Sequence, residues 1–461
     1  MKAFLVSAGL IFLSICAFSQ RVPGADDDQR KRNSSDWVRI SIAELDASND
    51  VDASKVYWIT DRGKEGFFVC DGRVANQRNE NGGTVIVNEG MQIFRRIYDG
   101  HIDVRWFGGV PDAQVPRAGS MVRGTNNTPA LQRAIDAADD NQLVVVPYGK
   151  WLFSTPLDSV KGPKRLNLKI EGDTYHNGSD FLILTNAGGM YEQHTVEFTG
   201  NATGNINLPR HTKETHDNGT QPQWSKITGT LVKIYNTYQV SVQFNKVEGF
   251  QQPIEIIGGR GNGSQENTIA GRWFYKNANG ITLTSLDGQS YCDKNVFTGV
   301  NNGLLRISGG LALKIDGYAG KAPNGEVYNG AFRSNEFHLV VEQVDSVAEC
   351  HGDITEPEFD ITVEGGVKTG VFGKVGFRMR SVAPNYVRSP RYEGRGIYGS
   401  DLLQNGMGVN GRIEVPIWNN KNWAYYGNSA VIDEKGDIVF PKATATQRSK
   451  LSAAPANFKF E

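Results

Sequence analysis

The chain has 461 residues, a formal net charge of −1 and 53 glycines. A nearly neutral chain has no overall field that would select nucleic acid or a membrane surface as its partner, so neither is expected. After the first 20 residues, no segment approaches the uninterrupted apolar run of about 18 to 20 residues that spans a bilayer.

The N-terminus is organised like a secretory signal peptide. Lys2 precedes an apolar run over residues 3–15, and residues 17–19 form a cleavage site with small outer residues. We therefore expect residues 1–19 to be a signal peptide and the protein to be secreted, either extracellular or periplasmic. Residues 20–36 are polar and mixed in charge, which predicts a flexible linker.

Residues 37–104 alternate short strand-like segments with turn signals. The segments combine β-branched and aromatic residues and are separated by Gly, Asn and Asp, at 56–60, 66–72, 82–90, 93–100 and 101–107. This pattern predicts a small β-rich N-terminal module.

A helix is predicted over residues 128–138. Thr128 is a suitable N-cap and Pro129 suits the first helical turn, where its missing N–H costs nothing. An apolar stripe then follows at helical spacing, formed by Leu131, Ala134, Ile135 and Ala138. The next segment, 143–146, is wholly apolar, which is typical of a parallel strand buried on both faces.

After residue 165 the chain becomes a series of strand-length segments with Gly or Asn at the corners. An Asn followed by apolar residues recurs at Asn245, Asn267, Asn295 and Asn335, at spacings of 22, 28 and 40 residues. Such near-regular spacing predicts a solenoid with one repeat per coil. In a solenoid, a corner Asn can bond backbone groups of the neighbouring coil.

Three segments together resemble the start of a known family. They are VRWFGG at 104–109, TPALQRAIDAA at 128–138 and VVVPYGKW at 144–151. This order is similar to that of the pectate-lyase-like, right-handed parallel β-helix superfamily, which includes polysaccharide lyases, glycoside hydrolases and phage tailspikes. The resemblance implies an all-β solenoid over 105–410 whose N-terminal end is capped by the helix. It implies no particular reaction, because the superfamily contains many.

The densest charged region supplies the candidate site. Strand alternation predicts that Glu336, His338, Glu358 and Asp360 point out of the coil. Asp360 follows His338 by 22 residues and Arg378 follows Asp360 by 18, each about one coil, which predicts three stacked rows on one outer face. The candidate catalytic residues are Asp360, Glu358, His338 and Arg378, and the candidate substrate-binding residues are Glu336, Lys374, Arg380 and Tyr386.

Two chemistries fit this face. Outward neighbours on a strand lie about 6.5 to 7 Å apart, a separation that suits two carboxylates and a water in inverting glycoside hydrolysis. Elimination from a uronic-acid polysaccharide instead needs a cation for the substrate carboxylate and a base for the α-proton. Residues 374–395 contain six basic residues and one acid, which favours an acidic polysaccharide or oligosaccharide as the partner.

Structural explanations stand beside these. Residues 342–364 contain eight carboxylates and no Lys or Arg, so the acidic and basic runs can also form a ladder of surface ion pairs. Trp273, Tyr275 and Tyr291 can stack on sugars or fill the core, as can Tyr386, Tyr392 and Tyr398. The protein can therefore be a polysaccharide lyase, a glycoside hydrolase or a non-catalytic polysaccharide-binding adhesin like a tailspike.

The C-terminal residues 411–461 change pattern. A hairpin is predicted around 434–436, followed by a polar tail that ends on the strand-like Phe458–Phe460. The segment resembles a tail-fibre-like terminal module, and a homotrimer is therefore one expected assembly. No Walker, Rossmann or zinc motif is present, so neither a cofactor nor a metal is expected.

Overall fold

The computed structural model describes the chain from residue 37 onward with gaps. The described residues are 37–49, 51–74, 80–115, 122–157, 160–161, 164–185, 193–206, 224–317, 319–321, 327–329, 331–351, 353–355, 358–364, 377–380, 391–395, 411–414, 429–432, 438–440 and 458–460. From residue 345 onward only the backbone is described.

A five-stranded sheet forms the N-terminal part, with the strand order β1-β2-β3-β5-β4. The strands are β1 (Trp37–Ile40), β2 (Val56–Ile59), β3 (Gly66–Arg73), β4 (Val85–Val87) and β5 (Gln92–Ile97). The sheet has its own core of Leu45, Tyr57, Ile59, Phe68, Ile86 and Phe94. Leu45 comes from the short helix α1 (Ile42–Asp46), whose Ser41 and Glu44 form a capping box. The sequence prediction missed this helix, although Ser41 and Glu44 have the spacing of that motif.

The prediction of a single strand over 101–107 is wrong for the second half of the segment. Strand β6 (His101–Asp103) pairs in parallel with β7 (Leu143–Val146), and Val104–Phe107 form the 3-10 helix η3. Asp103 terminates the strand because its carboxylate accepts a hydrogen bond from the Arg105 backbone N–H at 2.8 Å. The hydrogen bond from this local side-chain cap therefore favours a 3-10 helix, although the residues that follow have a high β-propensity.

Helix α2 spans Thr128–Ala137, in agreement with the predicted helix, but its cap differs. The N-cap is Asn127, whose side chain bonds the backbone of Val110 rather than the helix. The predicted apolar stripe is buried, and all four of its residues belong to the main core.

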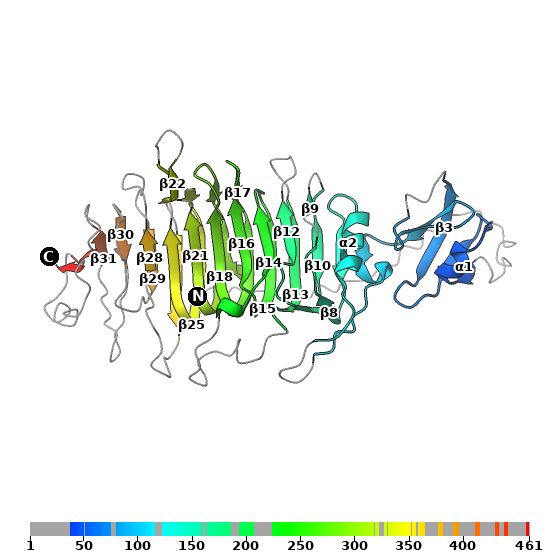
Figure 1. The fold of residues 1–461 in the computed structure, drawn as a ribbon, viewed down its shortest axis with the longest axis horizontal. Helices are drawn as coiled ribbons and strands as arrows, with labels where there is room; N and C mark the ends of the chain where they lie inside the picture. The colour runs from blue at the N-terminus through cyan, green and yellow to red at the C-terminus, as the bar shows by residue number, and fades with distance from the viewer. Residues whose placement is uncertain are drawn as a thin grey trace, which may run out of the picture.

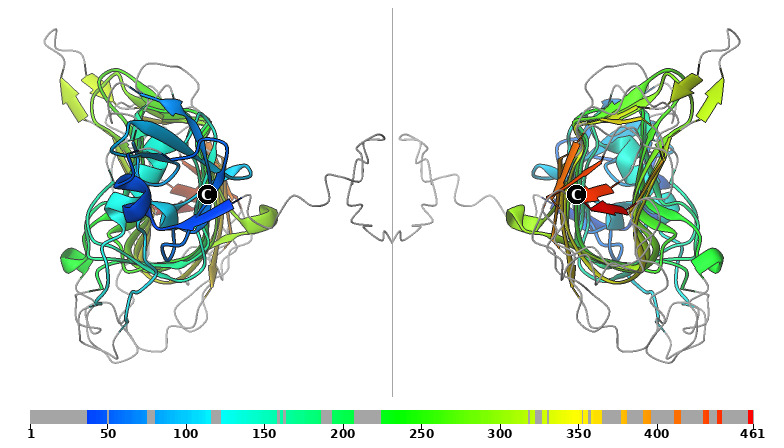
Figure 2. Two further views of the ribbon diagram at one scale, coloured as in Figure 1. Left: turned by 90° about the vertical axis from the view of Figure 1, so that its right-hand side faces the viewer. Right: turned by 90° about the vertical axis from the view of Figure 1, so that its left-hand side faces the viewer.

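Beyond α2 the chain forms a stack of coils held by parallel strand pairs (Figure 1). Seen along the stack, the strands superimpose around a common axis (Figure 2). Three rows of strands run along it. The first row contains β6, β7, β10 (Asn167–Ile170), β13 (Thr195–Thr203), β15 (Ser241–Glu248), β18 (Thr268–Ser285), β20 (Val296–Gly299), β25 (Glu336–His351), β27 (Glu358–Glu364) and β29 (Arg391–Arg395).

The other two rows share the longer strands, which bend from one face to the next. The second row contains β8 (Lys150–Phe153), β11 (Asp173–His176), later parts of β13, β15, β18 and β25, and the start of β21 (Leu305–Gly317). The third row contains β9 (Val160–Lys161), β12 (Leu182–Thr185), β14 (Thr230–Tyr235), β16 (Gln252–Gly258), the ends of β18, β21 and β25, and β28 (Phe377–Arg380).

Smaller elements complete the described chain. A four-stranded parallel sheet contains β17 (Gly263–Gln265), β19 (Tyr291–Asp293), β24 (Ala331–Arg333) and β26 (Asp353–Thr355), and β22 (Ala319–Lys321) pairs with β23 (Val327–Asn329). The short helices η5 and η6 span Trp224–Lys226 and Val300–Asn302. At the C-terminal end are β30 (Gly411–Glu414), β31 (Ser429–Ile432), β32 (Ile438–Phe440) and β33 (Phe458–Phe460). β31 pairs with β32 in antiparallel orientation, and the turn predicted at 434–436 between them lies outside the described residues.

Stacked phenylalanines fill the inside of the coils. Phe244 packs against Phe198 and Phe274 in the neighbouring coils, with ring centroids 5.2 and 5.4 Å apart, and Phe297 stacks on Phe337 at 5.1 Å. All five rings are at most 1% exposed. Phe198 is paired with Phe244 and Phe297 with Phe337 in the strand registers, so like side chains repeat at one position of neighbouring coils in these two places, whereas Phe274 is paired with Val247.

Asparagines form a second buried column, at the corner before the first row. The Asn267 side-chain amide donates to Asn295 Oδ1 at 2.8 Å, and the Asn295 amide donates to Asn335 Oδ1 at 2.9 Å. Three of the four predicted corner residues therefore form a ladder. Asn245 does not, because it lies on the exposed side of β15 and donates to Asn201.

Among the described residues, no helix is long and apolar enough to cross a membrane.

Candidate functional site

Strand β25 presents the first two predicted site residues on its outer side. Phe337 and Leu339 are fully buried, whereas Glu336 and His338 alternate with them and are half-buried. The His338 Nε2 atom lies 3.7 Å from Glu336 Oε2. The predicted alternation is therefore correct for this strand.

The next coil stacks two more predicted residues on these. In the parallel register of β25 and β27, Glu336 pairs with Glu358 and His338 pairs with Asp360. Paired positions in neighbouring strands lie about 4.8 Å apart, and residues two apart on one strand lie about 6.5 to 7 Å apart. These four positions therefore form a compact patch, which we name the acid–histidine patch.

The predicted third row of this stack is wrong. The residue after Asp360 in the column is Glu393 of β29, and Arg391 follows Glu358. Arg378 pairs with Glu349 and Arg380 pairs with His351, in the third row. One coil contains strands on three faces. The 18 residues between Asp360 and Arg378 therefore lead from the first row to the third row and do not return to the same face. Lys374 and Tyr386 lie outside the described residues.

Ion pairs lie on the outside of the stack, as expected from the alternative prediction of a ladder of surface ion pairs. Some join neighbouring coils, such as Lys233 with Glu255 at 3.6 Å and Arg306 with Glu342 at 2.7 Å. Others join residues two apart on one strand, such as Lys314 with Asp316 at 2.8 Å. Partly exposed pairs of this kind contribute about 0 to 1 kcal/mol each. Glu342 thus belongs to such a ladder.

A second candidate surface lies on the second row, on the strands that precede the acid–histidine patch. Trp273 and Tyr275 of β18 flank the buried Phe274 and point outward, with their ring centroids 4.6 Å apart at an interplanar angle of 62°. Lys246 is paired with Trp273 in the register of β15 and β18. We name Trp273, Tyr275 and Lys246 the aromatic platform.

Positive charge surrounds the platform. The Lys246 ammonium lies 4.5 Å from the Tyr275 ring centroid and 5.8 Å from that of Trp273, and Lys276 lies 4.9 Å from the Tyr275 centroid. Glu248 pairs with Lys246 at 2.9 Å. The arrangement can stack a sugar ring on an aromatic face and offer an ammonium group to its acidic substituent.

Strand alternation was the signal that could have identified the platform in the sequence. With Phe274 inside, its neighbours must point outward, so the alternative of core aromatics fails for Trp273 and Tyr275. Tyr291 instead lies on β19, where its hydroxyl bonds that of Tyr238 at 2.7 Å. The side chain of Tyr392 and all of Tyr386 and Tyr398 lie outside the described part.

Within the described residues, no group of three or more His, Cys, Asp or Glu side chains is arranged to bind a metal ion. Cys70 and Cys292 are free thiols, and Cys292 is buried and donates toward the backbone carbonyls of Ile256 and Thr284.

The parallel in-register coils define the class of fold as a β solenoid. No protein-family model and no curated protein matches the sequence. Structural comparison finds phage tailspike proteins among the similar solved structures.

One similar structure is the tailspike gp49 of Acinetobacter baumannii bacteriophage Fri1, described as a capsular polysaccharide depolymerase. It shares 12% identity over 81% of this chain and 70% of its own, with a TM-score of 0.44. The tailspike of Acinetobacter baumannii phage AM24 shares 12% identity over 77% of this chain, with a TM-score of 0.34, and this chain spans 64% of its length. The enzymatically active domain of tailspike protein 2 of bacteriophage CBA120 shares 11% identity over 85% of this chain and 54% of its own, with a TM-score of 0.36.

Proposed function

We propose that the protein binds an acidic polysaccharide along the outside of its solenoid and cleaves it. The observation that carries the proposal is the aromatic platform. Most large rings buried inside the coils are phenylalanines, together with Trp151, whereas Trp273 and Tyr275 of β18 point outward beside ammonium groups. Both rings are half-buried, and the Trp273 Nε1 atom is buried without a hydrogen-bond partner, so Trp273 offers only apolar surface to a sugar ring whereas Tyr275 also carries a hydroxyl.

The charges at the platform support an acidic ligand. Two ammonium groups, from Lys246 and Lys276, lie within 5 Å of one ring centroid, and Glu248 is ion-paired with one of them. A uronate or other acidic substituent would pair with the remaining positive charge. Salt should weaken such binding, because exposed charges are screened.

Cleavage is assigned to the acid–histidine patch. Glu358 and Asp360 alternate on one strand, and their register beside Glu336 and His338 supports a general acid and a general base on one face. Two carboxylates alone would favour a glycoside hydrolase. Removal of an α-proton by His338 would favour a polysaccharide lyase, and the loss of Arg378 from this face weakens that reading.

The binding half is tested by affinity electrophoresis in gels that contain acidic polysaccharides. We expect Trp273→Ala to weaken retardation by roughly 5-fold or more in Kd, by analogy with nucleobases, whose stacking on an aromatic side chain is worth about 1 to 3 kcal/mol. Trp37→Ala is the matched control, because Trp37 is 46% exposed but lies on the N-terminal sheet. Equal retardation of the two variants would remove the platform from the binding site.

The cleavage half is tested with a panel of acidic and neutral polysaccharides. Absorbance from unsaturated uronates would identify a lyase, and new reducing ends without that absorbance would identify a hydrolase. Asp360→Asn should abolish turnover and leave the melting temperature unchanged. Full turnover in this variant would withdraw Asp360 from the mechanism.

A non-catalytic adhesin is the second candidate, and the same platform supports it. Retained binding with no cleavage of any substrate would establish it in place of the enzyme. Export and homotrimeric assembly are further parts of the proposal, supported by the sequence of residues 1–19 and 411–461. Fractionation of the producing cells and light scattering on the purified protein test them.

A further inference from the structure

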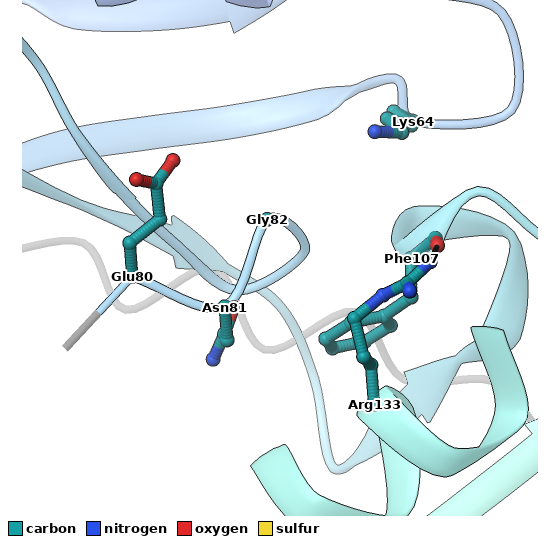
Figure 3. A pocket seen from close by; sticks show the side chains of 6 residues that line it. All are labelled: Lys64, Glu80, Asn81, Gly82, Phe107 and Arg133. Atoms are coloured by element: carbon teal, nitrogen blue, oxygen red, sulfur yellow. Dashed lines mark hydrogen bonds between the residues drawn. The ribbon is translucent and has the colours of Figure 1, made fainter. Parts of the chain in front are cut away.

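A hollow of about 590 Å³ lies where the N-terminal sheet meets the first coil, far along the chain from the platform and the patch. Its walls come from two sources: Lys64 and residues 80–82 from the loops that precede β3 and β4, and Phe107 of η3 with Arg133 of α2 from the solenoid. Figure 3 shows Lys64 and Arg133 on one side and Glu80 on the other, with Gly82 between them.

Buried hydrogen bonds hold these walls in place. The Arg96 guanidinium donates to the carbonyls of Lys64, Glu65 and Gly83 at 2.7 to 2.8 Å, and it lies between the rings of Phe68 and Trp106. Burial lowers the pKa of Arg96 to about 10, so it stays charged at neutral pH.

The loop at residues 80–82 is equally fixed. The Asn81 carboxamide oxygen accepts hydrogen bonds from three successive backbone N–H groups, those of Gly83, Thr84 and Val85, at 2.9 to 3.1 Å. Both walls are therefore formed before any ligand arrives, which lowers the entropic cost of binding.

The charges inside the hollow are not balanced by their neighbours. Among the described residues, neither Lys64 nor Arg133 has a carboxylate within 4.0 Å, and the Arg133 Nη2 atom uses a hydrogen on the Phe107 carbonyl at 2.6 Å. The remaining guanidinium hydrogens and the ammonium group are available to an anion. Glu80 supplies a carboxyl group across the hollow, and partial burial, with the charge of Asp46, raises its pKa.

We propose that this hollow binds a small hydroxylated carboxylate of the class of a single acidic sugar. Lys64 and Arg133 hold the carboxylate, and Glu80 accepts hydrogen bonds from the hydroxyls. The site is independent of the proposed function, because it shares no residue with the aromatic platform or the acid–histidine patch.

The test is isothermal titration calorimetry of the full chain with galacturonate. We expect saturable binding of galacturonate and none of glucose, and at least a 10-fold weaker Kd in Lys64→Gln, since a charged hydrogen bond contributes about 1.5 to 3 kcal/mol. Absence of galacturonate binding, or equal binding in Lys64→Gln, would overturn the proposal. Inorganic phosphate that binds as tightly as galacturonate would overturn the sugar class.

A filling variant separates occupancy of the hollow from charge. Gly82 has φ +71° and an added Cβ would meet nothing within 4 Å, and the same holds for Gly100 at φ +73° outside the hollow. Asn tolerates this left-handed conformation better than most residues. We expect Gly82→Asn to abolish binding and Gly100→Asn to preserve it, with both variants folded. Unchanged binding in Gly82→Asn would place the ligand elsewhere and overturn the site.

Discussion

His176 is buried in the core and only 1% exposed, where its ring stacks on Phe153 at a centroid distance of 5.8 Å and meets Phe181 edge-on at 4.7 Å. Its ring nitrogen Nε2 lies 3.0 Å from the Thr174 hydroxyl. Desolvation lowers the pKa of His176 from 6.5 to about 3, because the apolar surroundings penalise the imidazolium. The folded protein therefore holds His176 neutral at pH values where the unfolded chain binds a proton.

The free energy of unfolding should consequently fall as the pH drops from 6.5 toward about 3. The slope from this one residue is up to about 1.4 kcal/mol per pH unit. His176→Phe keeps an aromatic ring and removes the proton, so urea denaturation at several acidic pH values should show a shallower slope. An identical slope in the variant would assign the acid sensitivity to other groups.

Asn295 is the middle of the buried Asn column, where its side chain bonds both Asn267 and Asn335. Asn295→Ala leaves buried amide groups unpaired and should cost about 1 to 3 kcal/mol for each such group. Asn245→Ala is the control from the same sequence repeat, and because Asn245 is half-buried on the outer side of β15, its loss should change stability by only about 0.5 kcal/mol. Equal losses in denaturant titrations of both variants would contradict the ladder as a source of stability.

Helix α2 illustrates what the sequence could and could not predict. The buried face of α2 could be predicted from the sequence, because its apolar residues recur at the spacing of a helical turn. The N-cap of α2 could not be predicted. The Asn127 side chain forms hydrogen bonds with the backbone of Val110 instead of the helix, and this contact exists only in the folded chain. The candidate site divides in the same way: alternation placed Glu336 and His338 outside, but the face reached by Arg378 depends on how many strands make one coil.

The role of α2 as a lid on the first coil is a prediction of its own. Leu131 is fully buried against the core, and α2 contacts η3 and β7. Leu131→Asp should destabilise packing and expose the edge of the first coil, which favours association with other chains. Light scattering should detect aggregates in this variant and none in Asp136→Ala, on the exposed side of the helix. Monodisperse Leu131→Asp protein would contradict the lid.

At the scale of the molecule, the two largest of three apolar clusters among the described residues lie one in the N-terminal sheet and one in the coils. Arg96 contacts aromatic rings on both sides, Phe68 of the sheet and Trp106 of η3. Cores that share few contacts can unfold as separate cooperative units.

Calorimetry should therefore show two transitions. Phe94→Ala, in the sheet, and Phe244→Ala, in the coils, should each cost about 3 to 5 kcal/mol and lower different transitions. A single transition lowered by both substitutions would show that the two parts unfold together.

In the first row, strands of neighbouring coils pair in parallel even though the number of residues that connects them differs from coil to coil. Thr195 pairs with Ser241, 46 residues later, and Ser241 pairs with Thr268 after only 27. Closure of a coil is therefore set by its strands, and the connections between them are free to lengthen or change composition at little entropic cost. For protein engineering, the outer connections are positions where binding loops of different size can be exchanged while the stack beneath them stays in alignment.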